Sequence, residues 1–171
     1  MTTIPTLQTE RLTLRALEER DFDAYAAMMA DPEVARFLGT GAPLPRGEAW
    51  RQMAMILGHW TLRGYGLWAV EERATGAFLG RLGCWRPEGW PALEIGYTLA
   101  RPHWGRGFAS EGARASLAYA RDVLGADRVC SIIRPDNTAS IRVAERLGAV
   151  RGEELEFFGG RSLLFWYPPR A

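Results

Sequence analysis

The hydrophobic and polar positions in the first third of the chain predict one strand followed by helices. Residues 11–16 alternate between polar and apolar side chains, as in a strand that buries one face. Residues 21–30 carry apolar side chains at helical spacing. Asp31 and Pro32 predict the start of a second, short helix that ends near Gly39.

The longest predicted helix covers residues 46–63 and follows a loop with the sequence GTGAPLP. One side of this helix is apolar at helical spacing, so we expect that side to face the core. The predicted apolar stripe comprises Trp50, Met53, Ala54, Leu57 and Trp60.

After residue 65 the period of the pattern changes from helical to alternating. Residues 66–72, 77–85 and 92–100 alternate and predict consecutive strands joined by short turns. The remaining pattern predicts a helix over 108–124, a strand over 129–133, a helix over 136–147 ended by Gly148, and strands over 150–157 and 162–167. This order predicts a single mixed α/β domain rather than a regular doubly wound one.

Composition narrows the classes of partner. The 171 residues are 47% hydrophobic and 24% charged, as in an ordinary globular protein. A formal net charge of +1 gives no broad cationic surface for nucleic acid or an anionic membrane. No segment approaches the length of a membrane span, and the first residues lack the apolar run of a signal peptide. We therefore expect a cytoplasmic protein with neither nucleic acid nor membrane as a partner.

Cysteine and histidine are scarce and widely spaced. Cys84 and Cys130 each lie in an apolar, strand-like run, which favours buried free thiols in a reducing compartment. His59 and His103 have no cysteine at the close spacing of a structural metal site. We expect no metal.

The segment from Arg101 to Glu111 connects a predicted strand to a predicted helix and contains paired glycines. Gly105 and Gly107 permit backbone conformations that other residues avoid, so successive N–H groups can point at one anion. The positive end of the following helix adds to this attraction. The pattern predicts a phosphate or pyrophosphate site, although a glycine-rich connection without a ligand would have the same sequence.

Two other phosphate motifs fit this segment less well. A P-loop is excluded because no Gly-Lys-Ser/Thr ending is present. A dinucleotide fingerprint would use Ser110 as its third small residue and Asp127 as its ribose-binding acid. That motif would follow a three-stranded meander, which a dinucleotide-binding half does not contain, so it is a remote alternative.

Two further segments carry polar residues at informative spacing. Asn137 and Ser140 lie three residues apart at a helix start, so their side chains share one face of the first turn; capping alone would also explain them. In the strand over 92–100, Glu94 lies opposite the apolar face. Gly96 in the same strand indicates a bulge or the close approach of a ligand. Alternatively, Glu94 has no functional role and is a solvated strand residue.

Taken together and in this order, these segments resemble the GNAT acetyltransferases over essentially the whole chain. The resemblance is carried by TERLTLR at residues 9–15, by WGRGFASE at 104–111, and by Asn137, Ser140 and Leu147-Gly148. The first two are similar to the branch that includes ribosomal-protein N-terminal acetyltransferases. The resemblance implies a GNAT-like fold, a twisted mixed sheet of about six or seven strands with helices on both faces.

The resemblance also implies acetyl-CoA as co-substrate and assigns residues to its binding. The pyrophosphate loop corresponds to Trp104, Gly105, Arg106, Gly107, Phe108, Ala109 and Ser110. The pantetheine-binding strand end corresponds to Tyr97, Thr98 and Leu99, and the asparagine that contacts the cofactor arm corresponds to Asn137.

The chain departs from the family pattern at three places. Trp104 stands where the loop usually begins with Gln or Arg, and Ala149 stands where Phe usually follows Gly148. Ala144 occupies the position of the tyrosine that often protonates the leaving thiolate. That departure makes Ser140 the expected substitute, as in the branch named above.

The implied mechanism is direct attack of a neutral amine on the thioester within a ternary complex. An amine near pH 7 is mostly protonated, so a base must remove a proton. Glu94 is the candidate, directly or through a water. Backbone N–H groups from Gly96 to Leu99 would stabilise the developing oxyanion, and Ser140 would protonate or hydrogen-bond the departing sulfur.

The acceptor is expected to be a protein N-terminus or a small-molecule amine. The chain has 7 tryptophans, most of them expected in the core, and one or two could wall an acceptor pocket and hold an ammonium group. A monomer and a homodimer are both compatible with the sequence. The rival reading is a non-catalytic module that senses acyl-CoA, favoured by the missing tyrosine and opposed by the presence of Glu94 and Ser140.

Overall fold

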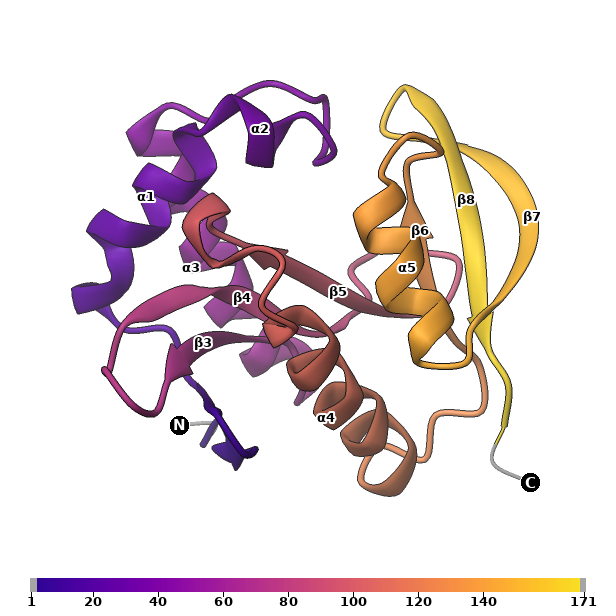
Figure 1. The fold of residues 1–171 in the computed structure, drawn as a ribbon, viewed down its shortest axis with the longest axis horizontal. Helices are drawn as coiled ribbons and strands as arrows, with labels where there is room; N and C mark the ends of the chain where they lie inside the picture. The colour runs from indigo at the N-terminus through magenta and orange to yellow at the C-terminus, as the bar shows by residue number, and fades with distance from the viewer. Residues whose placement is uncertain (1–2, 170–171) are drawn as a thin grey trace.

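The fold is built on one sheet. The structure is a computed structural model that describes residues 3–169. Within this range the sheet has eight strands in the order β1-β2-β3-β4-β5-β6-β8-β7 (Figure 1). Their bounds are β1 Leu7–Gln8, β2 Leu12–Arg15, β3 Leu67–Glu72, β4 Phe78–Trp85, β5 Leu93–Leu99, β6 Val129–Ile133, β7 Val150–Phe157 and β8 Gly160–Tyr167. Every pairing is antiparallel except that of β5 with β6.

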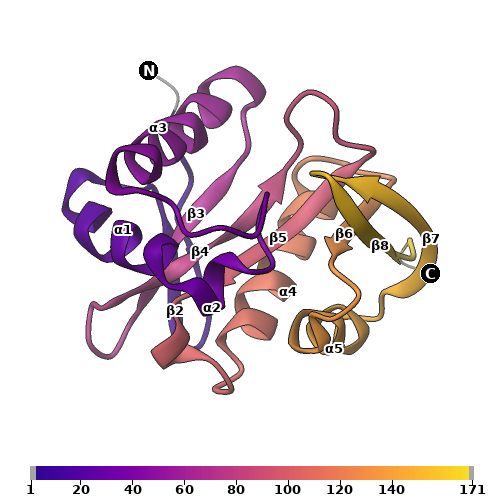
Figure 2. The same ribbon diagram turned by 90° about the horizontal axis from the view of Figure 1, so that it is seen from above.

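Helices cover both faces of this sheet (Figure 2). One side carries α1 (Phe22–Ala30), α2 (Pro32–Ala35) and α3 (Arg46–Arg63), and the other carries α4 (Phe108–Asp122) and α5 (Thr138–Arg146). Short 3-10 turns, Glu19–Asp21 and Arg101–His103, precede α1 and α4. The mixed α/β architecture expected from the order of elements is confirmed.

The strand count differs from the expectation of six or seven by the two-residue strand β1. Leu7 pairs with Leu14 and Gln8 with Thr13. A strand of two residues is too short to show an alternating pattern, so the sequence could not reveal it. Helix α5 also begins later than predicted, at Thr138, because Asn137 serves as its N-cap.

The predicted apolar stripe of α3 was wrong by about one residue. The buried side chains are Ala49, Met53, Ile56, His59 and Trp60, whereas Trp50 is 49% exposed. Both sets have helical spacing and share Met53 and Trp60, so they differ by a rotation of one position about the helix axis. The apolar character of Trp50 misled the assignment, since a single exposed aromatic side chain is normal on a protein surface.

Helix α4 packs close to the sheet through small residues. Gly112, Ala113, Ser116 and Ala120 are buried on the side that faces the strands. A methyl group added at Gly112 would lie 2.3 Å from Cδ2 of Leu82. The absent side chain therefore sets the distance between α4 and β4, and with it the position of the turn that begins the helix.

Cys84 and Cys130 are free and fully buried, in agreement with the sequence. Burial raises the pKa of the Cys84 thiol to about 12. A thiol with so high a pKa is a poor nucleophile at neutral pH, so Cys84 has a packing role.

Both thiols are expected to be reduced. Titration of denatured, non-reduced protein should count both cysteines as free thiols, because the two are separate in the fold. A count of zero in freshly purified protein would contradict this expectation.

Among residues 3–169, no helix is both long and apolar enough to cross a membrane.

Candidate active site

The centre of the sheet is split between β5 and β6. The two parallel strands pair only through Leu93 with Val129 and Glu94 with Cys130. Beyond this point the hydroxyl of Ser131 donates to the carbonyl oxygen of Ile95 at 2.7 Å, in the place of a ladder hydrogen bond. The strands therefore part toward the carboxyl end of β5 and leave a gap between them.

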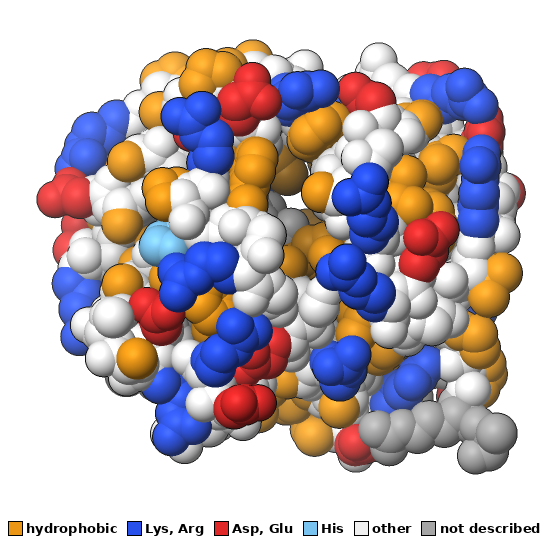
Figure 3. Space-filling view, in the orientation of Figure 1, with side chains coloured by type: hydrophobic (Ala, Val, Ile, Leu, Met, Phe, Trp, Pro, Cys, Tyr) orange, Lys and Arg blue, Asp and Glu red, His pale blue; other side chains and the backbone are white. Residues whose placement is uncertain are grey.

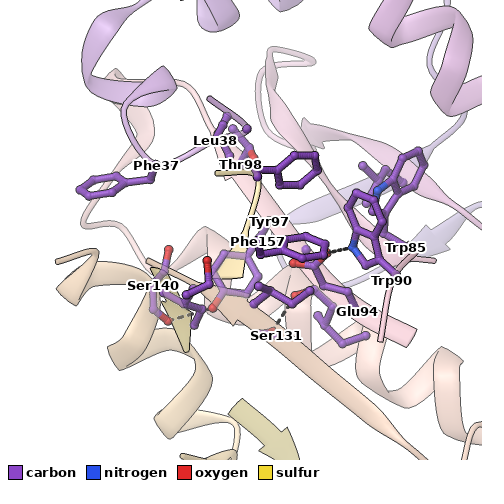
Figure 4. Close-up of a pocket in the computed structure, with 18 of the residues that line it drawn as sticks. Phe37, Leu38, Trp85, Trp90, Glu94, Tyr97, Thr98, Ser131, Ser140 and Phe157 are labelled. Atoms are coloured by element: carbon purple, nitrogen blue, oxygen red, sulfur yellow. Dashed lines mark hydrogen bonds between the residues drawn. The ribbon is translucent and has the colours of Figure 1, made fainter. Parts of the chain in front are cut away.

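A cavity of about 450 Å³ occupies this gap. It is bordered by β5, β6, the start of α5, the inner side of α3, residues 37–39 and the turn between β7 and β8. Figure 3 shows a hollow between the two halves of the molecule, with arginine side chains along its rim. Figure 4 shows the side chains that point into the cavity.

Glu94 lies on the cavity wall, where β5 and β6 begin to part. Its carboxylate accepts a hydrogen bond of 2.7 Å from the indole Nε1 of Trp90 (Figure 4). Burial raises the pKa of Glu94, although hydrogen bonds from Trp90 and the backbone of Ile132 and the charge of Arg81 act to lower it. The carboxyl group of Glu94 is therefore not simply a solvated group on the strand surface.

Gly96 does not form a bulge with β4, so that one of the two predictions for this glycine was wrong. The register between β4 and β5 is continuous, with Gly83 opposite Gly96 and Arg81 opposite Thr98. A methyl group added at Gly96 would come no closer than 3.9 Å to Glu94 or Leu67. The space in front of Gly96 is open cavity, so the approach of a ligand stays as its predicted role.

The backbone of β5 offers hydrogen-bonding groups to the gap. The carbonyl oxygens of Ile95 and Leu99 point to that side, where they accept from Ser131 and from the indole Nε1 of Trp104, the latter at 2.7 Å. Alternation along the strand directs the N–H and carbonyl of Tyr97 to the same side. Tyr97 therefore presents its backbone N–H and carbonyl to the gap, where a bound molecule could pair with them.

The start of α5 forms the opposite wall. The amide oxygen of Asn137 accepts from the backbone N–H of Ser140 at 3.2 Å, so Asn137 caps the helix as expected. The phenol of Tyr97 donates to the carbonyl oxygen of Ser140 at 2.8 Å and holds this turn against β5. Asn137 lines the cavity. Ser140 and Thr98 line it as well (Figure 4). The structure thus brings Glu94 and Ser140 to one space.

Ala144 lies one turn further along α5 and is fully buried. It packs in the core cluster that contains Ala113 and Leu117 of α4. Ala144 therefore offers no hydroxyl group to the cavity. The hydroxyl group of α5 that faces the cavity is that of Ser140.

The glycine turn before α4 has the expected conformation. Gly105 and Gly107 adopt φ angles of 73° and 80°, in the left-handed region. Gly107 is the N-cap of α4 and provides no side-chain hydrogen bond to the first-turn N–H groups. These groups are available to an anion outside the helix.

The residues predicted to bind the cofactor from this turn and from the end of β5 differ in how they could contribute. The side chain of Phe108 is 1% exposed, and that of Leu99 is 5% exposed, so each could reach a ligand only through its backbone. Trp104 is 43% exposed, and its indole fixes the turn to the end of β5.

The sequence did not reveal the side chains that hold this turn in place, which are Glu111, Thr9 and Arg11. The carboxylate of Glu111 accepts from the hydroxyl of Thr9 at 2.6 Å and from Nε of Arg11 at 2.7 Å. A second guanidinium nitrogen of Arg11 donates to the carbonyl oxygen of Arg106 at 2.9 Å. The guanidinium groups of Arg11 and Arg106 each lie 4.5 Å from the ring centre of Phe108. The TERLTLR segment was the available signal, but its contact with residue 111 spans about a hundred positions.

An aromatic cluster, which we define as Trp90, Phe157 and Phe158, closes the cavity near Glu94. Its rings meet edge to face, with centroids 4.7–5.3 Å apart. The sequence had suggested only tryptophan side chains as walls of an acceptor pocket. Phe157 ends β7 and Phe158 lies in the turn that follows, far along the chain from Trp90. Trp85 also lines the cavity and stacks on His59.

Comparison with known proteins agrees with this geometry. Residues 11–150 match the acetyltransferase (GNAT) domain family. The chain is 37% identical to the Bacillus subtilis protein YkkB, over 83% of each chain. It is 34% identical to the uncharacterized N-acetyltransferase p20 of Bacillus licheniformis, over 83% of this chain and 80% of that protein.

Solved structures give the same result. An acetyltransferase from Agrobacterium tumefaciens has a TM-score of 0.87 and 33% identity, with 98% of this chain and 96% of that one covered. A ribosomal-protein-S5-alanine acetyltransferase from Vibrio fischeri, at 16% identity and a TM-score of 0.74 over 96% and 97% of the chains, shares the fold alone. The chain belongs to the GNAT acetyltransferase family and is an acetyl-CoA-dependent acyltransferase.

Proposed function

We propose that the protein is an N-acetyltransferase in which a primary amine attacks the thioester of acetyl-CoA directly, with both substrates bound together. The observation that carries this proposal is the cavity between β5 and β6, because Glu94 and Ser140 both line it. Acetyl-CoA supplies the activated acetyl group. The protein must bind it, deprotonate the amine and stabilise the charge that develops.

Three features support the binding of acetyl-CoA in the gap. The N–H and carbonyl of Tyr97 are directed to hydrogen-bond the amides of the pantetheine arm, as an added strand would. The uncapped first turn of α4 suits the pyrophosphate, since N–H groups and the helix dipole both favour an anion there. The side-chain NH₂ of Asn137 is available to the arm, because the cap uses only its amide oxygen.

The chemistry follows from the two walls of the cavity. Glu94 takes a proton from the incoming ammonium group, directly or through a water; burial raises its pKa, which makes its carboxylate a stronger base. A second backbone N–H of the segment from Gly96 to Leu99 donates to the oxyanion that forms on the thioester carbonyl. The hydroxyl of Ser140 donates to the sulfur as the thiolate leaves.

The acceptor we propose is a primary amine, either a protein N-terminus or a small molecule. The TERLTLR and WGRGFASE segments favour the branch of ribosomal-protein N-terminal acetyltransferases, and the aromatic-lined cavity favours a small molecule. We propose a cytoplasmic enzyme that is a monomer or a homodimer.

Release of free CoA thiol from acetyl-CoA tests the proposal. The protein is incubated with a panel of amines and with peptides that have free N-termini, against an amine-free control. We expect amine-dependent thiol release and an acetylated amine of the expected mass. Tight acetyl-CoA binding without turnover on any amine would instead support the sensor that binds acyl-CoA.

Replacement of Ser140 by Ala is expected to slow turnover by about tenfold, the worth of a hydrogen bond to a developing charge. If the hydroxyl assists the leaving thiolate, the loss should persist at pH values below the thiol pKa of about 8.5 and diminish above it. Steady-state turnover measured across this pH range checks the expectation. Thr138→Ala, an exposed hydroxyl in the same turn of α5, is the matched control; equal rates for the two variants would contradict the role of Ser140.

A further inference from the structure

The cavity contains a cationic side chain for which the proposed mechanism has no use. Arg81 projects from β4 and lines the cavity, on the same face of the sheet as Thr98, Gly96 and Glu94. Its guanidinium forms no salt bridge with any carboxylate of residues 3–169, although its charge acts on Glu94. Its Nε is buried and lacks a hydrogen-bond partner within the same part of the chain.

The surroundings of Arg81 do not neutralise it. The phenol oxygen of Tyr25 accepts a hydrogen bond from Arg81, and its hydroxyl donates to the amide oxygen of Gln52 at 2.6 Å. Burial raises the pKa of Tyr25, so this partner stays uncharged. The buried Arg15 has carboxylate partners in Asp21 and Glu71. The half-buried Arg121 and Arg134 donate to backbone carbonyl oxygens. A guanidinium nitrogen out of contact with water normally has an acceptor, and the Nε of Arg81 has none among residues 3–169, so Arg81 points to an anionic group on a molecule that enters the cavity.

The positions of Arg81 and Glu94 suggest how the two ends of that molecule would bind. Arg81 lies opposite Thr98, and Glu94 is four positions away on the same face of β5. Residues two apart on one face of a strand are separated by about 7 Å, so Gly96 lies midway between the two charged side chains. Since Gly96 leaves open space there, a small molecule can extend across it from one charge to the other.

We propose that the acceptor is an amino acid with a large apolar side chain: its carboxylate binds Arg81, and its amine faces Glu94. This inference rests on the proposed function and names its substrate class. The aromatic cluster beside Glu94 and the apolar side chains of Met55 and Ile56 on α3 line the rest of the cavity. They supply a surface for the apolar side chain that a polyamine or an aminoglycoside would not use.

The test compares three acceptors that share a ring and a primary amine: L-phenylalanine, L-phenylalaninamide and 2-phenylethylamine. We expect kcat/KM for phenylalanine to exceed that for each of the others by about 10- to 100-fold, the worth of a charge-assisted pair. The amine of the amide is less basic and is more often unprotonated, so its intrinsic reactivity works against this result. The same kcat/KM for all three acceptors, or a preference for either one without a carboxylate, would overturn the proposal.

Replacement of Arg81 by Met is expected to remove the preference. The kcat/KM for phenylalanine should fall by about 10- to 100-fold, while that for 2-phenylethylamine changes little. Arg86→Met is the matched control, because Arg86 is exposed just beyond β4 and does not line this cavity. Retained affinity for CoA shows that the Arg81 variant is folded. An equal loss for all acceptors in a folded variant would assign Arg81 a structural role and overturn the inference.

The inference and the proposed function fail in different ways. Turnover with peptides or with amines that lack a carboxylate, and none with amino acids, would overturn the inference and leave the N-acetyltransferase intact. Absence of turnover with every amine and peptide, together with bound acetyl-CoA, would overturn both.

Discussion

Replacement of Glu94 by Gln is expected to lower turnover by about a hundredfold or more, while the affinity for acetyl-CoA stays nearly unchanged. Glutamine has the shape of glutamate and can still accept from the indole of Trp90 through its amide oxygen. It cannot remove a proton from an ammonium group. The variant therefore isolates the proposed proton transfer from the packing of the cavity.

The Glu94→Gln substitution should also change how the rate depends on pH. Glu94 acts as a base only when ionised, and burial raises its pKa, so the wild-type rate should fall as pH decreases through that raised value. The Gln variant lacks this group and should lack this part of the profile. As pH rises, more of the amine arrives already unprotonated, so the difference between the two enzymes should shrink.

Steady-state turnover with a reactive acceptor, measured at several pH values, checks both statements. Glu88→Gln is a matched control, because the Glu88 side chain is fully exposed in the same loop as Trp90. A Glu94→Gln enzyme with wild-type turnover across neutral pH would contradict the assignment. The base would then be a chain of waters or the substrate itself.

The elements of the fold were largely predictable because their signals are local. Alternation identified β3 to β8, and helical spacing identified α1, α3 and α4 within a few residues of their bounds. The turn at Gly105 and Gly107 was also readable, since paired glycines before a helix require little knowledge of the rest of the molecule. Asn137 at the start of α5 was readable for the same reason.

The features that escaped prediction depend on contacts between distant residues. The gap that makes the cavity arises because β5 and β6 stop pairing after Glu94, and no pattern within either strand encodes that departure. Arg81 has an unremarkable place in an alternating strand, and only the register with Thr98 brings it to the face of Glu94. Phe157 and Phe158, at the end of β7 and in the turn after it, reach Trp90 from more than sixty positions later. Side chains that define an acceptor pocket are chosen by the fold as a whole.

Replacement of Gly107 by Val is expected to weaken CoA binding by about a hundredfold or more, equivalent to about 3 kcal/mol. Gly107 has a φ of 80°, which a β-branched residue adopts only under strain. A Cβ at this position would also lie 3.3 Å from Nη2 of Arg11, the residue that supports the turn. The backbone should therefore shift, and the first-turn N–H groups of α4 should lose their common direction.

Calorimetric titration with CoA measures this loss, and circular dichroism establishes that the variant is folded. Gly64→Val is the matched control, because Gly64 ends α3 with a φ of 75° and an added Cβ there would meet nothing within 4 Å. This control carries the same kind of backbone strain at a place far from the glycine turn, so its affinity for CoA should be that of the wild type. If folded Gly107→Val binds CoA as tightly as the control does, the pyrophosphate does not depend on this turn, and the cofactor must enter the gap between β5 and β6 from another direction.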